Sequence, residues 1–157
     1  MLQRPGHDYY MEKAHQEALR AFDDGEVPVG AVVVDAHGSV IGRGANSMER
    51  LNDATAHAEI LAIGAAAAKL GTWRLNECQL YVTLEPCLMC LGAILNARIG
   101  VVVYGAADAR LGAIDSSFYR QEAQRAYRWF PHTTAGVLSD QCSALLAAFF
   151  EKVRKKD

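Results

Sequence analysis

The sequence lacks a long apolar run and a strong excess of either charge. Its most hydrophobic stretches, such as ILAIGAAAA, are far too short to span a bilayer, and the first ten residues, MLQRPGHDYY, contain no apolar core typical of a signal peptide. We therefore expect a cytoplasmic protein with no membrane partner. The 16 Lys and Arg residues nearly balance the 18 Asp and Glu residues, so the net charge of −2 gives no global attraction to nucleic acid.

Cysteine is also scarce, and only one pair is closely spaced. The chain has four cysteines: Cys78, Cys87, Cys90 and Cys142. In a chain of this size and expected compartment, thiols are more typical than structural disulfides, and a closely spaced pair indicates a metal or redox site. Cys78 and Cys142 lack such spacing, and we predict that both are buried packing residues.

No repeat, low-complexity run or linker interrupts the 157 residues, of which 51% are hydrophobic. A single domain of this length buries roughly two thirds of its unfolded surface, so it needs no metal or disulfide in order to fold. We therefore interpret residues 1–157 as one domain, in which a bound metal would serve function rather than folding.

Hydrophobic periodicity alternates between helix and strand along the chain. Apolar residues recur at helical spacing from about 8 to 22, and two β-branched runs around the turn DAHGS predict a hairpin from about 29 to 45. One helix is then expected to open near Ala56, with Thr55 as its cap, and another near Cys87, with Pro86 in its first turn. The strand QLYVTLE lies between these two helices.

The remaining segments continue the alternation. We expect a strand over IGVVVYGA, a short helix over SSFYRQEAQRAYRW, a weaker last strand over HTTAGVL and a closing amphipathic helix over 139–155. Strands joined through helices by short connections imply right-handed crossovers and a parallel portion of sheet, to which the hairpin adds an antiparallel edge. The predicted fold is α/β, with a central mixed five-stranded sheet in a three-layer α/β/α arrangement.

Four side chains with metal and proton chemistry lie where the two central helices begin: His57, Glu59, Cys87 and Cys90. Helices that follow strands of one sheet start at the same edge, so these two N-termini can converge. Cys87 and Cys90 are three residues apart and can reach one ion, and unpaired N–H groups at a helix start favour thiolates. His57 supplies a third ligand.

Two sulfur ligands and one nitrogen ligand are typical of a catalytic zinc that keeps its fourth position for water. A structural zinc would have a fourth protein ligand, but the other cysteines stand alone, and the other histidines form no ligand-spaced pair: His7, His15, His37 and His132. Zinc lowers the pKa of bound water toward about 7, and Glu59 can take the proton of that water without being a ligand.

Each of these features has a simpler explanation when it is taken alone. A CxxC pair also occurs in redox motifs, and a single His or Glu at a helix start is usually a cap or a solvated side chain. The combination of HAE and PCLMC, each at a helix start, favours a catalytic zinc site.

The same residues carry a family resemblance. HAE followed by PCLMC resembles the H-x-E and P-C-x-x-C signature of the zinc-dependent cytidine and deoxycytidylate deaminase superfamily. Longer stretches are similar to those of bacterial tRNA adenosine deaminases, which make inosine at the wobble position: EVPVGAVVV, ATAHAEILA, LYVTLEPCLMCLGAILNARIGVVVYGAAD and CSALLAAFF. The likeness covers residues from about 10 to 112 and resumes near 136.

The resemblance implies a cytidine deaminase-like fold, a single deaminase domain over residues 1–157 and a homodimer. It implies one Zn²⁺ per chain on His57, Cys87 and Cys90, with Glu59 as the catalytic proton shuttle. The implied reaction is hydrolytic: water adds at C6 of adenine, and ammonia leaves after Glu59 protonates the amino group.

The resemblance also implies a pocket for the target base. Asn46 would hydrogen-bond the purine, Val29 and Leu84 would form apolar walls, and the backbone of Ala58 would add polar contacts. A buried base needs such polar partners because each unpaired buried group costs about 1–3 kcal/mol.

One segment departs from the family pattern. Residues 111–134 lack the glycine-and-serine turn and the Asn-His pair that the family has there. Four aromatic side chains could stack on unpaired bases: Tyr119, Tyr127, Trp129 and Phe130. Helical spacing instead favours burial in the core for three residues of the segment: Phe118, Ala126 and Trp129.

Three functions remain open from the sequence. The first is a tRNA adenosine deaminase that binds the anticodon loop, with five candidate phosphate contacts: Arg110, Lys152, Arg154, Lys155 and Lys156. A solvated helix end explains the last four equally well. The second is a deaminase of a free purine base such as guanine, of a nucleoside or of a related amino-heterocycle. The third is a zinc-stabilised interaction module without turnover, which the presence of Glu59 disfavours.

Overall fold

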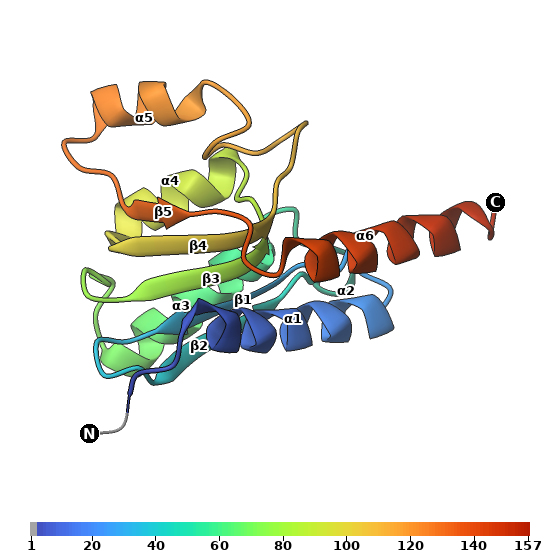
Figure 1. Cartoon of the computed structure of the whole chain (residues 1–157), viewed down its shortest axis with the longest axis horizontal. Helices are drawn as coiled ribbons and strands as arrows, with labels where there is room; N and C mark the ends of the chain where they lie inside the picture. The colour runs from blue at the N-terminus through green and yellow to red at the C-terminus, as the bar shows by residue number, and fades with distance from the viewer. Residues whose placement is uncertain (1–2) are drawn as a thin grey trace.

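A mixed sheet of five strands forms the centre of the computed structural model, which describes residues 3–157 (Figure 1). The strands lie in the order β2-β1-β3-β4-β5, and their bounds are β1 Gly30–Val34, β2 Val40–Ala45, β3 Gln79–Leu84, β4 Val101–Ala106 and β5 His132–Thr134. β1 pairs antiparallel with both β2 and β3, whereas β3, β4 and β5 run parallel. The predicted α/β class and mixed five-stranded sheet are confirmed.

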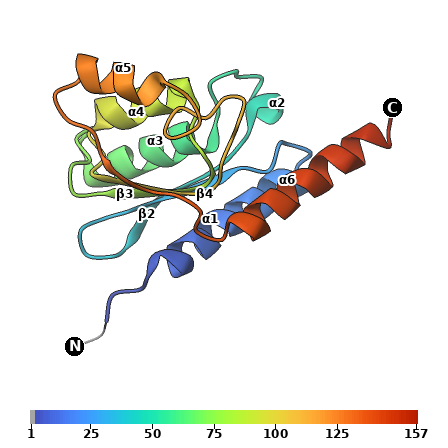
Figure 2. The ribbon, with the colours of Figure 1, turned by 45° about the horizontal axis from the view of Figure 1, so that its top comes forward.

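Helices cover both faces of this sheet, as Figure 2 shows. One face carries α1 His7–Asp23 and α6 Ser139–Arg154, and the other carries α3 Ala58–Leu70 and α4 Leu88–Ala97. A short helix, α5 Tyr119–Ala126, lies next to α4. The predicted three-layer arrangement is therefore confirmed. None of the helices in the described part of the chain is long and apolar enough to cross a membrane.

The apolar core is divided between the two faces of the sheet. Alternate residues of a strand point to opposite faces, so Ala31 and Val33 of β1 join the cluster under α3 and α4, while Val32 and Val34 pack against α1. Because β1 is covered on both faces, all of its residues are buried. Cys78 and Cys142 are buried as predicted, one in each cluster.

Two glycines of β2 bring the start of α3 onto the sheet. A Cβ at Gly44 would collide with the carbonyl oxygen of Ala58, and one at Gly42 would collide with that of Ala62. The absence of side chains at these positions lets the helix backbone approach the strand closely. The first turn of α3, which carries Glu59, is therefore held in a fixed place beside β2.

The helix starts differ in detail from the sequence prediction. Thr55 does not cap α3: its hydroxyl donates to Asp53 Oδ1 at 2.7 Å, and its backbone N–H donates to the same oxygen at 2.8 Å. This Asx turn uses the threonine side chain, so His57 becomes the N-cap residue. Likewise Cys87 is the N-cap residue of α4, and Pro86 lies just before its first turn.

The prediction that Phe118 and Ala126 belong to the core was wrong. Phe118 is 64% exposed, and Ala126 is also exposed, whereas Trp129 is partly buried. The face of α5 that packs against the core is formed by Tyr119 and Ala123. Helical spacing identified the helix but not which of its faces packs against the core. The sequence also gave no sign of α2 Met48–Leu51, which follows β2.

Candidate active site

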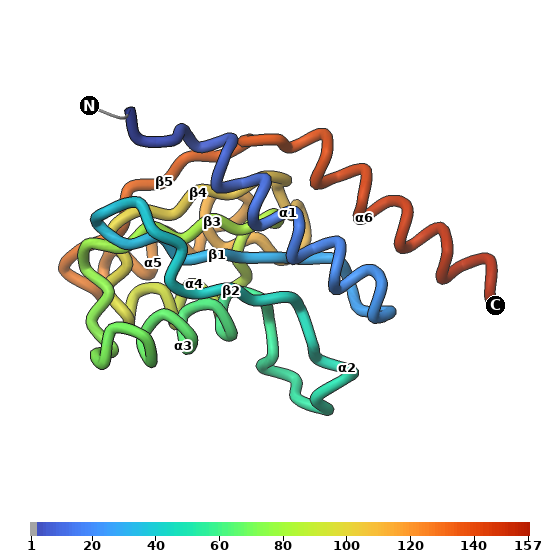
Figure 3. The backbone as a smooth tube through the Cα atoms, turned by 90° about the horizontal axis from the view of Figure 1, so that it is seen from below, coloured from blue at the N-terminus to red at the C-terminus, as the bar shows by residue number. Residues whose placement is uncertain are grey.

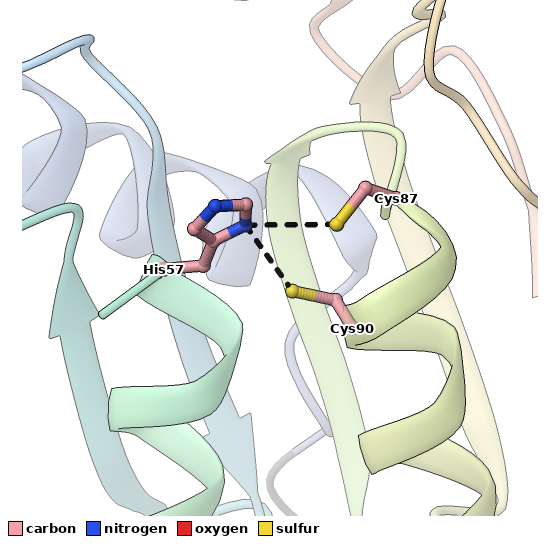
Figure 4. A group of neighbouring side chains, drawn as sticks. All are labelled: His57, Cys87 and Cys90. Atoms are coloured by element: carbon pink, nitrogen blue, oxygen red, sulfur yellow. Dashed lines mark hydrogen bonds between the residues drawn. The ribbon is translucent and has the colours of Figure 1, made fainter. Parts of the chain in front are cut away.

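The N-termini of α3 and α4 lie side by side, and Figure 4 shows the three side chains that meet between them. His57 and Cys87 are the N-cap residues of the two helices, with extended backbone conformations, and Cys90 lies in the first turn of α4. These positions place the imidazole and both thiols beside N–H groups that have no partner inside their helix. The convergence predicted from the sequence is therefore present.

The distances within this cluster fit a tetrahedral metal ion. His57 Nδ1 lies 3.6 Å from Cys87 Sγ and 3.5 Å from Cys90 Sγ. Tetrahedral zinc with ordinary Zn–N and Zn–S bonds separates its nitrogen and sulfur ligands by about 3.6 Å. The ligand atoms of all three residues lie within 4.8 Å of one another, and no fourth His, Cys, Asp or Glu between residues 3 and 157 joins them. The donor set fits an ion that keeps one coordination position for a non-protein ligand.

The ionisation of the cluster also favours a cation. A hydrogen bond with Cys90 lowers the pKa of Cys87 to about 4 against the opposing effect of burial, and raises the pKa of Cys90 above the usual range of a thiol. The pKa of His57 is raised, chiefly by its hydrogen bond with Cys87. The imidazole and the two sulfur atoms therefore share protons through hydrogen bonds. A metal ion bound by the same three atoms can replace those protons.

Glu59 lies in the first turn of α3, beside this cluster but outside its ligand set. Its side chain is buried, with 3% of the residue exposed, and it lines the same cavity as His57 and Cys87. Burial raises the pKa of Glu59 above its usual range. A raised pKa makes the carboxylate a stronger base than an exposed one, and a general base and acid has to accept a proton and then return it.

A cavity of about 710 Å³ opens in front of the cluster. This volume lies within the range of about 300–1,000 Å³ that is common for small-molecule sites. Eight of the residues singled out in the sequence line it: Val29, Asn46, His57, Ala58, Glu59, Leu84, Cys87 and Arg110. Cys90, in contrast, is fully buried behind the cavity wall. The structure therefore brings the predicted base-pocket residues and metal ligands into one cavity.

Asn46 presents an unsatisfied hydrogen-bonding group to this cavity. The residue is 7% exposed, and its Nδ2 donates to the carbonyl oxygen of Val27 at 3.1 Å. Its Oδ1 is buried and has no hydrogen-bond partner among the described residues. Buried polar atoms are rarely left unpaired, because this costs about 1–3 kcal/mol, and a ligand that donates a hydrogen bond would satisfy this oxygen.

Sequence reasoning missed several of the cavity walls. One wall is the segment 107–111 after β4, and another is formed by Leu146 and Phe150 of α6. Leu146 and Phe150 are four residues apart and so share one face of the helix, which was a usable signal. The placement of 107–111 depends on contacts with distant residues, so no local pattern identified it.

The basic residues at the end of α6 lie outside the cavity. Figures 1 and 3 show the C-terminal half of this helix extending past the body of the protein. Lys152 lies over the Phe22 ring at 5.2 Å, and Lys155 forms an ion pair with Glu151 at 3.1 Å. Arg154 and Lys156 are exposed and make no ion pair with another described residue. Of the cations predicted to contact phosphate, Arg110 alone lines the cavity.

Comparisons with known proteins agree with this geometry. The family described as "Cytidine and deoxycytidylate deaminase zinc-binding region" matches residues 5–106. A tRNA-specific adenosine deaminase of Bacillus subtilis (strain 168) is 42% identical over 149 residues, which cover 95% of this chain and 91% of the relative.

Two solved structures extend the comparison. A chain from a study of A-to-I editing by tRNA:A34 deaminases at the wobble position of transfer RNA matches with a TM-score of 0.82 at 42% identity, over 87% of this chain and 98% of that one. Guanine deaminase from Bacillus subtilis matches with a TM-score of 0.62 at 30% identity, over 78% of this chain and 96% of that one.

The fold and the site together define a hydrolytic deaminase with a cytidine deaminase-like fold. The chain belongs to the cytidine and deoxycytidylate deaminase family, and its similarity within that family is greater to a tRNA-specific adenosine deaminase, at 42% identity, than to guanine deaminase, at 30%.

Proposed function

We propose that this protein converts adenosine to inosine by hydrolysis at the wobble position of tRNA. The observation that carries the proposal is one cavity lined by His57, Cys87, Glu59 and Asn46, in a chain that is 42% identical to a tRNA-specific adenosine deaminase. A tRNA substrate also supports the expected cytoplasmic location. Because the cavity draws on residues from Val27 to Phe150, its composition supports a single deaminase domain over the chain.

His57, Cys87 and Cys90 are proposed to hold one zinc ion per chain. Two sulfur ligands and one nitrogen ligand at the observed separations suit zinc, and family membership points to the same metal. When bound, the ion supplies Lewis-acid chemistry, lowering the pKa of a water molecule from about 15.7 toward about 7. The thiolate form of Cys87 is already favoured in the protein, whereas Cys90 keeps its proton until a metal ion replaces it.

Glu59 is proposed to move the proton during the reaction. Its carboxylate accepts a proton from the attacking water as the oxygen bonds to C6 of adenine. The same carboxyl group then delivers that proton to the amino nitrogen, and the bond between C6 and this nitrogen breaks. Adenosine and water are thereby converted into inosine and ammonia. The burial of Glu59 keeps its proton away from bulk water between the two transfers.

Asn46 and the apolar walls are proposed to hold the flipped base. Val29 and Leu84 offer apolar surface to the flat purine, and Ala58 lines the cavity beside His57. Asn46 Oδ1 is an acceptor that an N–H or O–H group of the nucleoside would satisfy. An analogue that lacks this donor would leave the oxygen unpaired, so the residue contributes to specificity as well as affinity.

The RNA around the target base is proposed to contact the cavity mouth and α6. Arg110 lines the cavity, and Phe150 lines it while remaining 45% exposed, so both can be reached by nucleotides next to the target. Arg154, the last residue of α6, and Lys156, just beyond the helix, are available for phosphate. These contacts give an acidic protein a local basic surface for the anticodon loop.

A homodimer is proposed as the functional assembly. Leu88 is 52% exposed and Met89 36% exposed, and both lie in the first turn of α4 beside Cys87. Exposed apolar side chains that lie together on a surface commonly mark a contact with another chain. Light scattering measured as the protein elutes from a size-exclusion column should give twice the mass of one chain. The mass of a single chain at micromolar concentration would reject the dimer.

One assay distinguishes the proposed function from its alternatives. Zinc-loaded protein is offered an anticodon stem-loop with adenosine at the wobble position and, in parallel, free adenine, guanine, adenosine and cytidine. We expect inosine in the RNA and little ammonia from the small compounds. Ammonia from guanine or another small compound alone would instead show a small-molecule deaminase. If none of these substrates reacts although the protein contains its full amount of zinc, the chain is an interaction module without turnover.

A further inference from the structure

Glu85 is a buried carboxylate that the proposed chemistry does not use. It follows β3 directly, two residues before Cys87, and is only 2% exposed. Carboxylates are rarely this deeply buried without a partner of opposite charge. Glu85 has no such partner among the described residues; its partners are hydrogen-bond donors from a single segment of the chain.

That segment is the rim loop, residues 107–116, which leads from β4 toward α5 (Figure 1). Five donors of the rim loop bond to the Glu85 carboxylate: the backbone N–H of Asp108 to Oε1 at 3.1 Å, those of Ile114, Asp115 and Ser116 to Oε2 at 3.0, 2.8 and 3.0 Å, and the Ser116 hydroxyl to Oε1 at 2.5 Å. One side chain thus satisfies backbone groups at both ends of the loop.

The rim loop closes tightly on this carboxylate. A Cβ at Gly112 would collide with Glu85 Cδ and would lie 2.5 Å from the carbonyl oxygen of Asp108. One further hydrogen bond ties the loop to the same connection, because Ala113 N–H donates to the Pro86 oxygen at 2.8 Å. At the start of the loop, Glu85 N–H donates to the oxygen of Ala106, the last residue of β4, also at 2.8 Å. The loop therefore has little freedom to move while Glu85 is in place.

The position of the rim loop matters because the loop forms one side of the cavity mouth. Its residues 107–111 line the cavity, including Arg110 and the 52% exposed Leu111. The far end of the loop is also fixed from outside, since the Asp115 carboxylate accepts a hydrogen bond from Tyr104 at 2.6 Å and lies 3.4 Å from Arg120. Glu85 thus connects the rim loop to the end of β3, and Asp115 connects the loop to β4 and α5.

We propose that Glu85 is a positioning residue that governs how RNA enters the site: its carboxylate holds the rim loop, and the rim loop places Arg110 and Leu111 at the mouth. The effect on RNA rests on the proposed function, whereas the effect on the loop does not. Glu85 also lines the cavity, but both of its carboxylate oxygens are occupied by donors of the rim loop. Its replacement should therefore change substrate binding more than the chemical step.

The first test replaces Glu85 by glutamine, which keeps the size of the side chain but turns one acceptor oxygen into an N–H donor. We expect the zinc content and kcat to stay within about threefold of wild type, while KM for the stem-loop rises about tenfold or more. The control is Glu17→Gln, because Glu17 is also buried but pairs with Arg20 on α1. This variant should leave KM unchanged.

The second test needs no substrate. Hydrogen exchange should show faster exchange of the Ile114, Asp115 and Ser116 amides in Glu85→Gln, with the rest of the sheet unchanged. Gly112→Ala disturbs the same loop with the carboxylate intact, and should raise KM and speed the same amides even if Glu85→Gln does not fold. If no form of the protein acts on RNA, the exchange data still decide whether Glu85 holds the loop.

Two results would overturn the proposal. One is unchanged exchange of the rim-loop amides in folded Glu85→Gln. The other is a loss confined to kcat together with a loss of zinc, which would show that Glu85 supports the metal ligands instead of the mouth.

Discussion

At the scale of single residues, Glu59 separates metal binding from turnover. Glu59→Gln removes the proton acceptor without removing a metal ligand, so we expect full zinc content and a loss of kcat by about 10²-fold or more. Metal content is measured by atomic emission and turnover by inosine formation in the stem-loop. Loss of zinc in this variant would show that Glu59 is itself a ligand.

The four cysteines give a second prediction at this scale. Burial raises the pKa of the Cys142 thiol to about 11 and also raises that of Cys78, whereas the pKa of Cys87 is lowered to about 4. In protein treated with a chelator at pH 7, iodoacetamide should therefore label Cys87 first and leave Cys78 and Cys142 unmodified until the chain unfolds.

Bound zinc should protect Cys87 from this labelling, because the ion occupies the thiolate that reacts. Mass spectrometry of peptides locates the label. Equal labelling of Cys87 with and without zinc would exclude Cys87 as a ligand, and rapid labelling of Cys142 in the folded protein would contradict its burial.

Single residues also show the extent of what a sequence can predict. The metal ligands and the catalytic carboxylate were recognisable because their chemistry depends on spacing within two short motifs, HAE and PCLMC. These residues are His57, Glu59, Cys87 and Cys90. Glu85 stands directly before one of those motifs, but its role depends on donors 23 to 31 residues away, so that role becomes visible only in the folded structure. Asn46 was identified by resemblance, and the structure adds its unpaired oxygen.

At the scale of elements, the close contact between α3 and β2 positions the site. A methyl group at Gly44 would collide with the carbonyl oxygen of Ala58, one residue before Glu59. Gly44→Ala should therefore lower the free energy of unfolding by about 1–3 kcal/mol and also reduce kcat, because α3 has to move. Urea denaturation measures the stability.

The matched control is Gly64→Ala on the exposed side of α3, where a Cβ would meet nothing within 4 Å. This substitution should leave activity unchanged and should stabilise the helix slightly, since alanine has a higher helix propensity than glycine. Equal effects of the two substitutions would contradict the account of how α3 is held.

Element boundaries were predicted less well than the elements themselves. The helices, strands and hairpin followed from periodicity, but the first turn of α3 depends on an Asx turn at Asp53 that competes for the Thr55 side chain. α2 spans only four residues, too few for a periodic pattern. Phe118 was misplaced because the spacing of α5 does not reveal which face packs against the core.

At the scale of the whole molecule, RNA binding has to overcome a net charge of −2. Replacing Arg154 and Lys156 by alanine should raise KM for the stem-loop several-fold and reduce the slope of log affinity against log salt by about 0.7 per lost phosphate contact. Activity assays at several salt concentrations give both values. Lys69→Ala, at the exposed C-terminal end of α3, is the control and should change neither.

Every step of the proposed reaction depends on a zinc ion that His57, Cys87 and Cys90 bind with one coordination position left open to solvent. X-ray absorption at the zinc edge of the purified protein measures these ligands. We expect two sulfur ligands at about 2.3 Å and two light ligands at about 2.0–2.1 Å, one from His57 and one from solvent. A third sulfur ligand, or a spectrum of zinc without sulfur, would contradict this ligand set.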